Sequence, residues 1–223
     1  KSGNSDVDID SLKSESSNLK LRSKGLAEEL DKVKIRISDL VTTVPNIPDL
    51  KVPEGLTEEN NIEVFRSSNF KESGYNLKNH WDLSKEYDII DFELGSKITG
   101  SGFPVYKDKG AKLQRALINF FLDKNSSAGY KEFQVPHLVN SDSAYATGQL
   151  PDKDGQMYHV TNDDFYLIPT AEVPLTNIYR DKILAIEQIP IMMTGYTPCF
   201  RREAGSYGSD VRGLNRLHQF DKV

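Results

Sequence analysis

The segment Thr197-Pro-Cys-Phe-Arg-Arg-Glu-Ala-Gly-Ser-Tyr-Gly-Ser-Asp-Val-Arg-Gly-Leu-Asn-Arg-Leu-His-Gln-Phe-Asp-Lys-Val223 decides the fold of the second half of this chain. Its residue order predicts a strand, a glycine-rich loop and a returning strand. Because side chains alternate between the two faces of a strand, Arg201 and Glu203 should share one face of the first strand. The same alternation places three residues on one face of the returning strand: Arg216, His218 and Phe220.

This predicted surface has the chemistry of a nucleotide site. An arginine fork matches phosphate oxygens, a carboxylate accepts a hydrogen bond from an amine, and an aromatic ring can stack on a base. A basic strand–loop–strand is more often a solvated hairpin, so these residue types alone do not decide the function. The whole segment 197–223, however, resembles without a gap the nucleotide-binding motif 2 of the class II aminoacyl-tRNA synthetases, in the wording of the seryl-tRNA synthetases.

A second segment, Tyr166-Leu-Ile-Pro-Thr-Ala-Glu-Val-Pro-Leu-Thr-Asn177, resembles the serine-pocket strand and the following helix of the same family. Without the resemblance, it predicts a strand that ends at a helix, with Thr170 as N-cap and Glu172 at the positive end. The resemblance implies instead that Thr170, Ala171 and Glu172 contact L-serine. Hydrogen bonding of the serine hydroxyl would let such a site reject alanine or glycine, because losing that partner leaves buried polar groups unpaired.

The composition is that of a globular chain of 223 residues, with 37% hydrophobic and 27% charged residues, long enough for one large domain and an appendage. No apolar run approaches the ~18–20 residues needed to cross a membrane, and no signal-peptide pattern opens the chain. We therefore expect a cytoplasmic protein without a membrane partner. The net charge of −5 does not indicate nucleic-acid binding, so any tRNA contact must come from locally basic surface.

The chain has one cysteine, Cys199, and four histidines that lie far apart in the sequence. A single cysteine excludes a disulfide framework within the chain and is consistent with a reducing compartment. The histidines lack the spacing of metal ligands, which argues against a structural zinc site. Cys199 should face the core beside the strand that carries Arg201.

The first 44 residues form a separate helical segment. Apolar residues recur at heptad spacing in two series: Leu12, Leu19, Leu26, Val33 and Leu40, then Leu30, Ile37 and Val44. This pattern predicts a long helix that packs against a helical partner, and on its own it is typical of any coiled coil or bundle. The resemblance implies the antiparallel two-helix arm that grips the long variable arm of tRNA(Ser). Only one helix of that arm is present, so its partner is either missing from this chain or supplied by a second molecule.

Prolines between residues 45 and 56 mark a linker, since proline removes a backbone donor and restricts the residue before it. The polar stretch 57–79 predicts loop and an edge strand, and residues 80–98 resemble the family's entry to the catalytic domain. We therefore expect three parts: residues 1–44 as a partial tRNA-binding arm, residues 45–56 as the linker, and residues 57–223 as the N-terminal part of the catalytic core.

Residues 110–123 predict an amphipathic helix whose apolar face should lie in the core or in an interface. That face carries Leu113, Ala116, Leu117, Phe120 and Phe121. A predicted strand follows and ends at a proline, Tyr130–Pro136. Helix, strand and proline in this order resemble motif 1, which builds the dimer interface of the class II family, and imply a homodimer with Pro136 near the two-fold axis. The stretch Thr147-Gly-Gln-Leu-Pro151 should form a loop near the mouth of the site.

From residue 45 onward the resemblance implies an α+β fold: an antiparallel class II β-sheet core flanked by helices, incomplete at the C-terminus and preceded by part of a helical coiled-coil arm. The implied activity is that of a serine–tRNA ligase, which joins L-serine and ATP to seryl-adenylate and then charges tRNA(Ser). The chain stops before the family's serine-binding glutamate and its third motif, so we expect this polypeptide alone to be inactive.

In the implied first step the serine carboxylate attacks the α-phosphate of ATP, so positioning and charge stabilisation should carry the rate. Arg201 would bind the α-phosphate and serine, and Glu203 would help to fix the nucleotide, Mg²⁺ or the substrate amine; these are the expected catalytic residues. The other ATP-binding residues implied are Arg202, Arg216, the Leu217 backbone and Phe220, with the Phe220 ring on adenine. Alternation, however, places Arg202 on the opposite face. The segment Ser206–Asp210 should form a mobile loop near the tRNA acceptor end.

Other interpretations stay open. A serine-type ligase that charges a carrier protein would lack the long arm, and a non-catalytic binding protein could retain a degenerate synthetase core. The residues of the segments 170–172 and 212–220 disfavour a class II synthetase for threonine or proline. For threonine, the lack of a set of zinc ligands is a further argument against it. Serine-dependent ATP–pyrophosphate exchange distinguishes these classes.

Overall fold

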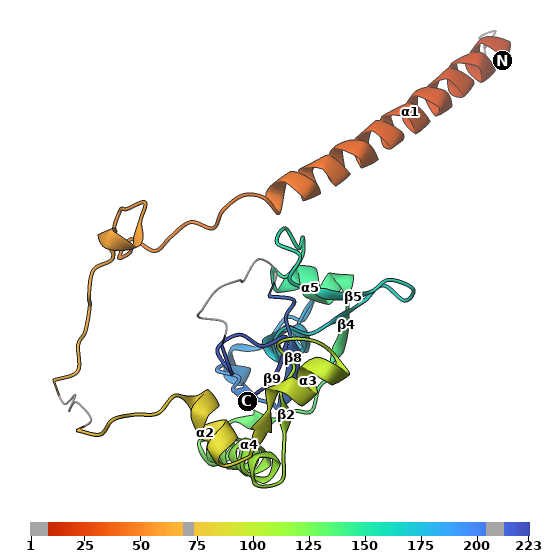
Figure 1. Cartoon of the computed structure of the whole chain (residues 1–223). Helices are drawn as coiled ribbons and strands as arrows, with labels where there is room; N and C mark the ends of the chain where they lie inside the picture. Colours follow the sequence, from red (N-terminus) through yellow and green to blue (C-terminus); the bar gives the residue numbers. More distant parts are fainter. Residues whose placement is uncertain (1–8, 69–73, 204–211) are drawn as a thin grey trace, which may run out of the picture. The chain divides into compact units, whose positions relative to one another are not determined.

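The computed structural model describes residues 9–68, 74–203 and 212–223 and divides into two compact units, Lys1–Lys71 and Glu72–Val223. Figure 1 gives the elements of both units. The predicted loop Ser206–Asp210 lies outside the described residues. Within those residues, no helix has the length and apolar character that crossing a membrane requires. The three-part division at residues 44 and 56 stays a prediction.

The N-terminal unit contains the predicted long helix, α1 (Ile9–Val41), followed by an extended segment and one 3-10 turn, η1 (Glu58–Asn60). Helix α1 ends slightly before the predicted residue 44, where the Thr42 and Thr43 hydroxyls donate to the carbonyls of Asp39 and Leu40. The described residues between 57 and 79 form no strand, so the predicted edge strand is wrong for that part of the chain.

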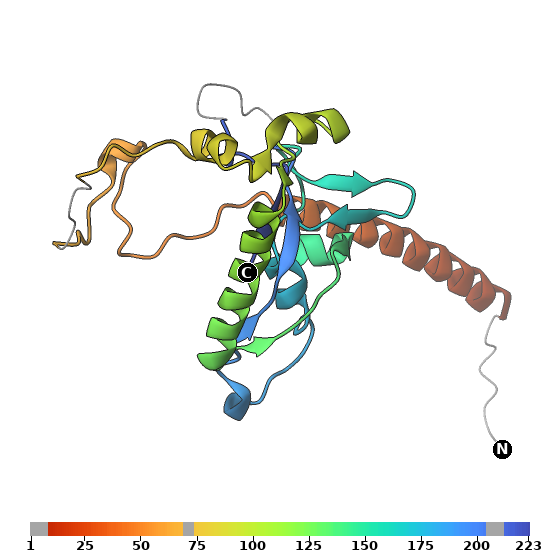
Figure 2. The same ribbon diagram turned by 60° about the horizontal axis from the view of Figure 1, so that its bottom comes forward.

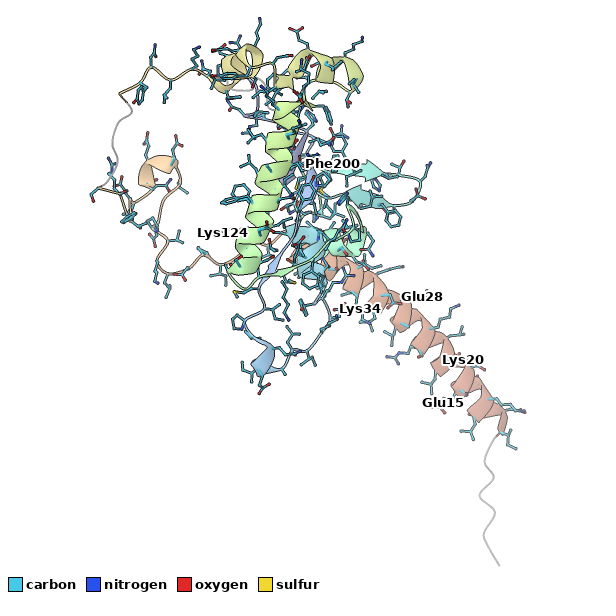
Figure 3. All side chains as sticks on the ribbon, turned by 90° about the horizontal axis from the view of Figure 1, so that it is seen from below. Glu15, Lys20, Glu28, Lys34, Lys124 and Phe200 are labelled. Carbon is cyan, nitrogen blue, oxygen red and sulfur yellow. The ribbon has the colours of Figure 1, made fainter. Side chains whose placement is uncertain are left out.

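The heptad face of α1 is exposed in this chain. Its seam leucines leave more than half of their surface open to solvent, with Leu12 at 52% and Leu19 at 57%. Figure 3 shows charged side chains projecting along the whole helix, among them Glu15, Lys20, Glu28 and Lys34. An exposed apolar seam flanked by charges suits a helix that packs against a partner, and the helical partner itself stays a prediction.

The C-terminal unit begins with short helices and strands around one long helix. Its first elements are α2 (His80–Glu86), β1 (Ile90–Asp91), α3 (Phe92–Ile98), β2 (Val105–Tyr106), α4 (Lys109–Ser127) and β3 (Lys131–Glu132). They are followed by β4 (Leu138–Asn140), α5 (Ser141–Ala146), β5 (Tyr158–Val160), β6 (Phe165–Leu167) and α6 (Glu172–Asn177). The last are η2 (Ile186–Gln188), β7 (Met193–Thr194), β8 (Thr197–Phe200) and β9 (Gln219–Lys222).

Antiparallel pairing dominates the sheets, and the predicted hairpin is confirmed. Strands β8 and β9 pair antiparallel with Cys199 opposite Phe220, and β4, β6 and β5 form a three-stranded antiparallel sheet in that order. The amide of Phe200 donates to the carbonyl of Ile168 at 2.9 Å and so joins the hairpin to the segment after β6. The fold is therefore α+β, and Figure 1 shows the β8–β9 pair within the C-terminal unit.

The core of the unit lies between the three-stranded sheet and α6. Val139, Ile168 and Val173 form its buried cluster, with Tyr166 packed against them. Cys199 is fully buried, as predicted, and burial raises the pKa of its thiol. Burial of these apolar groups fixes the end of β6 against the start of α6, which positions the segment 168–172 beside the hairpin.

Helix α4 is amphipathic, but its apolar face is not part of the core. Leu113, Leu117, Phe120 and Phe121 are between 45% and 59% exposed. The flank of this face lies on the strands: Asn125 donates to the Thr194 hydroxyl at 2.9 Å, and Leu117 and Phe121 line a cavity beside β9. Figure 2 shows α4 beside the segment that contains β7 and β8. The prediction that this apolar face lies in the core is wrong for this chain. The alternative, that it lies in an interface, remains a prediction. The predicted strand 130–136 is also shorter, because only Lys131–Glu132 pair, in parallel, with β7.

Candidate nucleotide and amino-acid site

A cavity of about 460 Å³ opens where the end of β8, strand β9 and the start of α6 meet. Its walls are formed by Gln149, Gln156, Pro169, Thr170, Glu172, Arg201, Glu203, Arg216 and Lys222. The cavity thus brings together both sequence segments that resemble the seryl-tRNA synthetases. Gln149 belongs to the loop 147–151, which was predicted to lie at the mouth of the site.

Arg201 follows directly after β8 and is held by three groups. Its amide donates to the carbonyl of His218 at 2.9 Å, and its Nε donates to the carbonyl of Pro169 at 3.3 Å. Its guanidinium lies 5.1 Å from the centre of the Phe220 ring. Ion pairs between the described residues do not include Arg201, so its charge is available to a ligand.

Glu203 lines the same cavity as Arg201, as alternation predicts, although the chain has left the strand there and Glu203 has a φ of +48°. Its carboxylate accepts a hydrogen bond from Arg216 at 3.0 Å, and its side chain is only 14% exposed. A partly buried ion pair of this kind orients both side chains. The pair closes one side of the cavity.

The segment 170–172 forms the other side, and Thr170 is not the helix N-cap. Helix α6 begins at Glu172 after Ala171, and no side chain caps it. The Thr170 hydroxyl instead accepts a hydrogen bond from the Lys222 ammonium at 2.9 Å, and the Glu172 carboxylate accepts from the same ammonium at 3.2 Å. Ala171 is buried and does not line the cavity, unlike its two neighbours. Thr170 therefore presents its hydroxyl to the cavity rather than to the helix.

Strand alternation fails for the residues before β9. Because β9 begins only at Gln219, Arg216 and His218 lie in a turn, and of the predicted set Arg216, His218 and Phe220 only Arg216 lines this cavity. The His218 ring stacks on Phe103 at 5.3 Å and its Nδ1 lies 2.6 Å from the Tyr158 hydroxyl. Burial raises the pKa of Tyr158, which keeps this hydroxyl protonated.

The remaining predicted ATP-binding residues lie around the cavity. Arg202 points away from it, over the Tyr158 ring at 5.8 Å, while its amide donates to Gln156. Leu217 is buried. Phe220 lies under Arg201 and lines two neighbouring cavities. The strand alternation that places Arg202 on the opposite face is thus consistent with the geometry. Its ATP-binding role stays a prediction.

The turn before β9 is anchored by the start of α2. The Leu214 amide donates to Nε2 of His80 at 2.7 Å, so the proton of that imidazole is on Nδ1, and Arg212 lies 5.8 Å from the Trp81 ring. A Cβ at Gly213, where φ is +67°, would come within 2.1 Å of the His80 ring. Only glycine fits there. Residues 80 and 81 thus hold the turn that presents Arg216.

The other face of β9 is tied to α4 and to the short link between β7 and β8. Asp221 accepts hydrogen bonds from the Tyr196 hydroxyl at 2.7 Å and from the Gln114 amide. Burial, together with the Asp221 carboxylate, raises the pKa of Tyr196 to about 12, so this phenol remains a donor. These contacts fix β9 from below and leave Phe220 and Lys222 on its opposite face.

The cavity carries three cations and two carboxylates, paired as Arg216 with Glu203 and Lys222 with Glu172. Among the described residues no group of three or more His, Cys, Asp or Glu side chains could hold a metal ion by itself. Mg²⁺ in nucleotide sites is usually held by one or two carboxylates and the substrate phosphates. Glu203 fits that more limited role.

Lys222, Gln156 and Pro169 line the cavity but were not predicted from the sequence to be site residues. Lys222 lies two positions after Phe220 on the same strand, so alternation could have placed both on one face. No sequence signal marks Gln156, which reaches the cavity from the irregular segment before β5.

Comparison with known proteins shows which proteins this chain is similar to. Residues 157–223 match the tRNA synthetase class II core domain (G, H, P, S and T). Over 188 residues the chain is 54% identical to a serine–tRNA ligase of Salinibacter ruber, covering 84% of this chain and 44% of that protein. It is 50% identical over 199 residues to a serine–tRNA ligase of Solibacter usitatus, covering 89% of this chain and 47% of the relative. The chain thus spans less than half the length of these relatives.

Solved structures with the same fold include two proteins that carry a nucleotide. Seryl-tRNA synthetase from Pyrococcus horikoshii complexed with ATP superposes with a TM-score of 0.82 at 28% identity, over 96% of this chain and 53% of that one. The cytoplasmic serine–tRNA ligase from Naegleria fowleri in complex with AMP gives a TM-score of 0.76 at 28% identity, over 89% of this chain and 47% of that one. In sequence and in fold this chain is therefore similar to the seryl-tRNA synthetases, and its residues 157–223 carry part of the class II tRNA synthetase core.

Proposed function

We propose that the complete gene product containing this chain is a serine–tRNA ligase, which activates L-serine with ATP and transfers the seryl group to tRNA(Ser). One observation carries the proposal: a single cavity is lined on one side by the Arg201 guanidinium, which forms no ion pair within the described residues, and on the other by the Thr170 and Glu172 oxygens. The first side suits a phosphate and the second suits the ammonium group of an amino acid. Relatives named serine–tRNA ligase, at 54% and 50% identity, support the choice of serine.

In this proposal the residues of the chain bind and orient the two substrates. Arg201, fixed by the Pro169 carbonyl and the Phe220 ring, contacts the α-phosphate, where negative charge develops as the serine carboxylate attacks. Thr170 and Glu172 receive the serine ammonium. Because attack by a carboxylate needs little proton transfer, the cavity contributes mainly position and charge.

The nucleotide would lie along the hairpin. Arg216, oriented by Glu203, would contact the outer phosphates, and the Leu217 backbone and the Phe220 ring would contact the nucleoside. Two structural relatives are complexed with ATP and with AMP, which supports nucleotide binding by this fold. Mg²⁺, which ATP chemistry usually requires, would be held by Glu203 and phosphate oxygens and would neutralise charge there. Arg202 stays a proposed ATP contact.

Serine-dependent ATP–pyrophosphate exchange on the complete gene product tests the proposal. Exchange with serine and none with threonine, alanine or proline is the expected result. Failure of every amino acid to support exchange, in a folded protein, would favour a non-catalytic relative.

The acceptor is proposed to be tRNA rather than a carrier protein because the chain carries α1, a long exposed helix with heptad leucines. This helix would form half of the arm that binds tRNA(Ser). A role in tRNA charging would place the protein in the cytoplasm. Charging of tRNA(Ser) by the purified enzyme, with an acyl carrier protein as the alternative acceptor, separates the two classes.

The Phe220→Ala variant should bind ATP about 10-fold more weakly, because stacking of an aromatic ring on a base contributes about 1–3 kcal/mol. The Michaelis constant for serine should change much less. Pyrophosphate exchange at varied ATP and varied serine measures both constants. An unchanged ATP constant would contradict a stacking role for Phe220.

We propose a homodimer built on α4, whose exposed apolar face needs a partner, with Pro136 near the two-fold axis. The Phe120→Asp variant should be monomeric at micromolar concentration, because it places a charge in the middle of that face. Asn119→Asp, on the same helix outside the apolar face, is the matched control and should remain dimeric. Light scattering gives the mass of each, and a monomeric wild type would contradict the proposal.

A further inference from the structure

Lys222 occupies a position in the cavity that the proposed function assigns to a substrate group. Its ammonium donates to the Thr170 hydroxyl at 2.9 Å and to the Glu172 carboxylate at 3.2 Å. These two acceptors are the oxygens that would receive the ammonium of the amino acid. A lysine ammonium and the protonated amine of an amino acid carry the same charge and the same three donors, so the two groups repel each other and compete for these oxygens.

We propose that the Lys222 ammonium is an internal stand-in for the substrate ammonium and that the amino acid displaces it on binding. This inference rests on the proposed function. It assigns to Lys222 a role in setting the affinity for the amino acid. The hydrogen bonds of Thr170 and Glu172 are satisfied in both states, first by Lys222 and then by the ligand.

The exposure of the side chains supports displacement in the Lys222–Glu172 ion pair rather than in the Arg216–Glu203 ion pair. The Lys222 side chain is 38% exposed and that of Glu172 is 75% exposed, so separating them leaves neither charge buried. The Glu203 side chain, in contrast, is only 14% exposed in its pair with Arg216. Exposed ion pairs contribute little to stability, and breaking one is correspondingly easy. Lysine also has a long, flexible stem, which lets its ammonium move aside without a change in the backbone.

Lys222 should affect the two charged groups of the amino acid in opposite directions. The carboxylate of an α-amino acid is two bonds from its nitrogen, so an ammonium displaced from the nitrogen's position stays within reach of the carboxylate. Lys222 therefore competes with the amine and attracts the carboxylate. A ligand that keeps the amine and hydroxymethyl groups of serine but lacks the carboxylate isolates the competition.

Serinol (2-amino-1,3-propanediol) is such a ligand, and the test is its inhibition constant against serine in pyrophosphate exchange by the complete gene product. In Lys222→Gln, serinol should bind about two- to fivefold more tightly than in the wild type, because the competing exposed ion pair is gone. Serine itself should bind about 10-fold more weakly, because the contact to its carboxylate is lost. Calorimetric titration with serinol checks, in the absence of turnover, whether Lys222→Gln binds serinol more tightly than the wild type does.

Weaker serinol binding to Lys222→Gln overturns the proposal, since a lysine that merely orders Thr170 and Glu172 would help both ligands. Serinol that inhibits neither protein also overturns it. Lys182→Gln, which removes a lysine ammonium that lies over the Tyr179 ring outside the cavity, is the matched control and should leave both constants unchanged. Lys222→Met provides the same comparison should the glutamine variant not fold.

The wild-type enzyme separates this inference from the proposed function. If the wild type shows no serine-dependent exchange, the proposed function itself fails. If the wild type exchanges normally and serinol does not bind more tightly to Lys222→Gln, only the role of Lys222 is wrong.

Discussion

The Arg201→Ala variant of the complete gene product should lose serine-dependent pyrophosphate exchange by about 10²–10³-fold, the usual effect of removing one preorganised donor to a charge that develops in the transition state. Arg201 is fixed by the His218 and Pro169 carbonyls and by the Phe220 ring, so its guanidinium needs no reorganisation when the α-phosphate arrives. The loss should fall mainly on kcat, with the Michaelis constant for serine changed less.

Arg202→Ala is the natural control, because Arg202 is the next residue and its guanidinium lies over Tyr158, outside the cavity. Its loss of exchange should be at least 10-fold smaller than that of Arg201→Ala. Circular dichroism and thermal unfolding would check that both variants fold. Near-normal exchange by Arg201→Ala would remove Arg201 from the mechanism. Equal losses would show that Arg202 also binds ATP, as the family resemblance implies.

Deletion of residues 12–44 should separate the two steps of the reaction. Adenylate formation, measured by pyrophosphate exchange, should remain near the wild-type rate, because the cavity lies entirely in the unit Glu72–Val223. Aminoacylation at a limiting tRNA concentration should fall about 10- to 100-fold, since losing one hydrogen bond to a charged phosphate costs about 1.5–3 kcal/mol.

A milder test of tRNA binding leaves helix α1 in place and changes only its charges. Lys20→Gln with Lys34→Gln removes two of the cations that project from α1 and should weaken tRNA binding with a reduced dependence on salt. Glu15→Gln with Glu28→Gln is the matched control on the same helix and should not weaken it. Equal loss of both reaction steps on deletion of 12–44 would indicate that the helix supports the fold rather than the tRNA.

The sequence by itself determined the elements whose signal is local. The heptads predicted α1, the amphipathic spacing predicted α4, and the strand–loop–strand of residues 197–223 predicted the hairpin that pairs Cys199 with Phe220. Alternation also placed Arg201 and Glu203 on one surface. Each of these rests on the period of a helix or a strand, which neighbouring residues specify without help from distant parts of the chain.

Local periodicity failed where a regular element ended earlier than its pattern suggested. Strand β9 begins at Gln219, so the turn before it sends His218 to Phe103 while Arg216 reaches the cavity. The apolar face of α4 read equally well as core or interface, because a helix pattern shows that a face is apolar but not what covers it. Only the arrangement of α4 on the strands decided that this face is exposed.

Tertiary structure alone decided the partners of the cavity residues. Thr170 had the sequence signature of a helix N-cap, yet its hydroxyl accepts a hydrogen bond from Lys222, a residue 52 positions later in the chain. That contact exists because backbone pairing of Phe200 with Ile168 docks the hairpin against the end of β6. Side chains so distant in sequence meet only after burial of the core has fixed both segments, and no local pattern records which of them will meet.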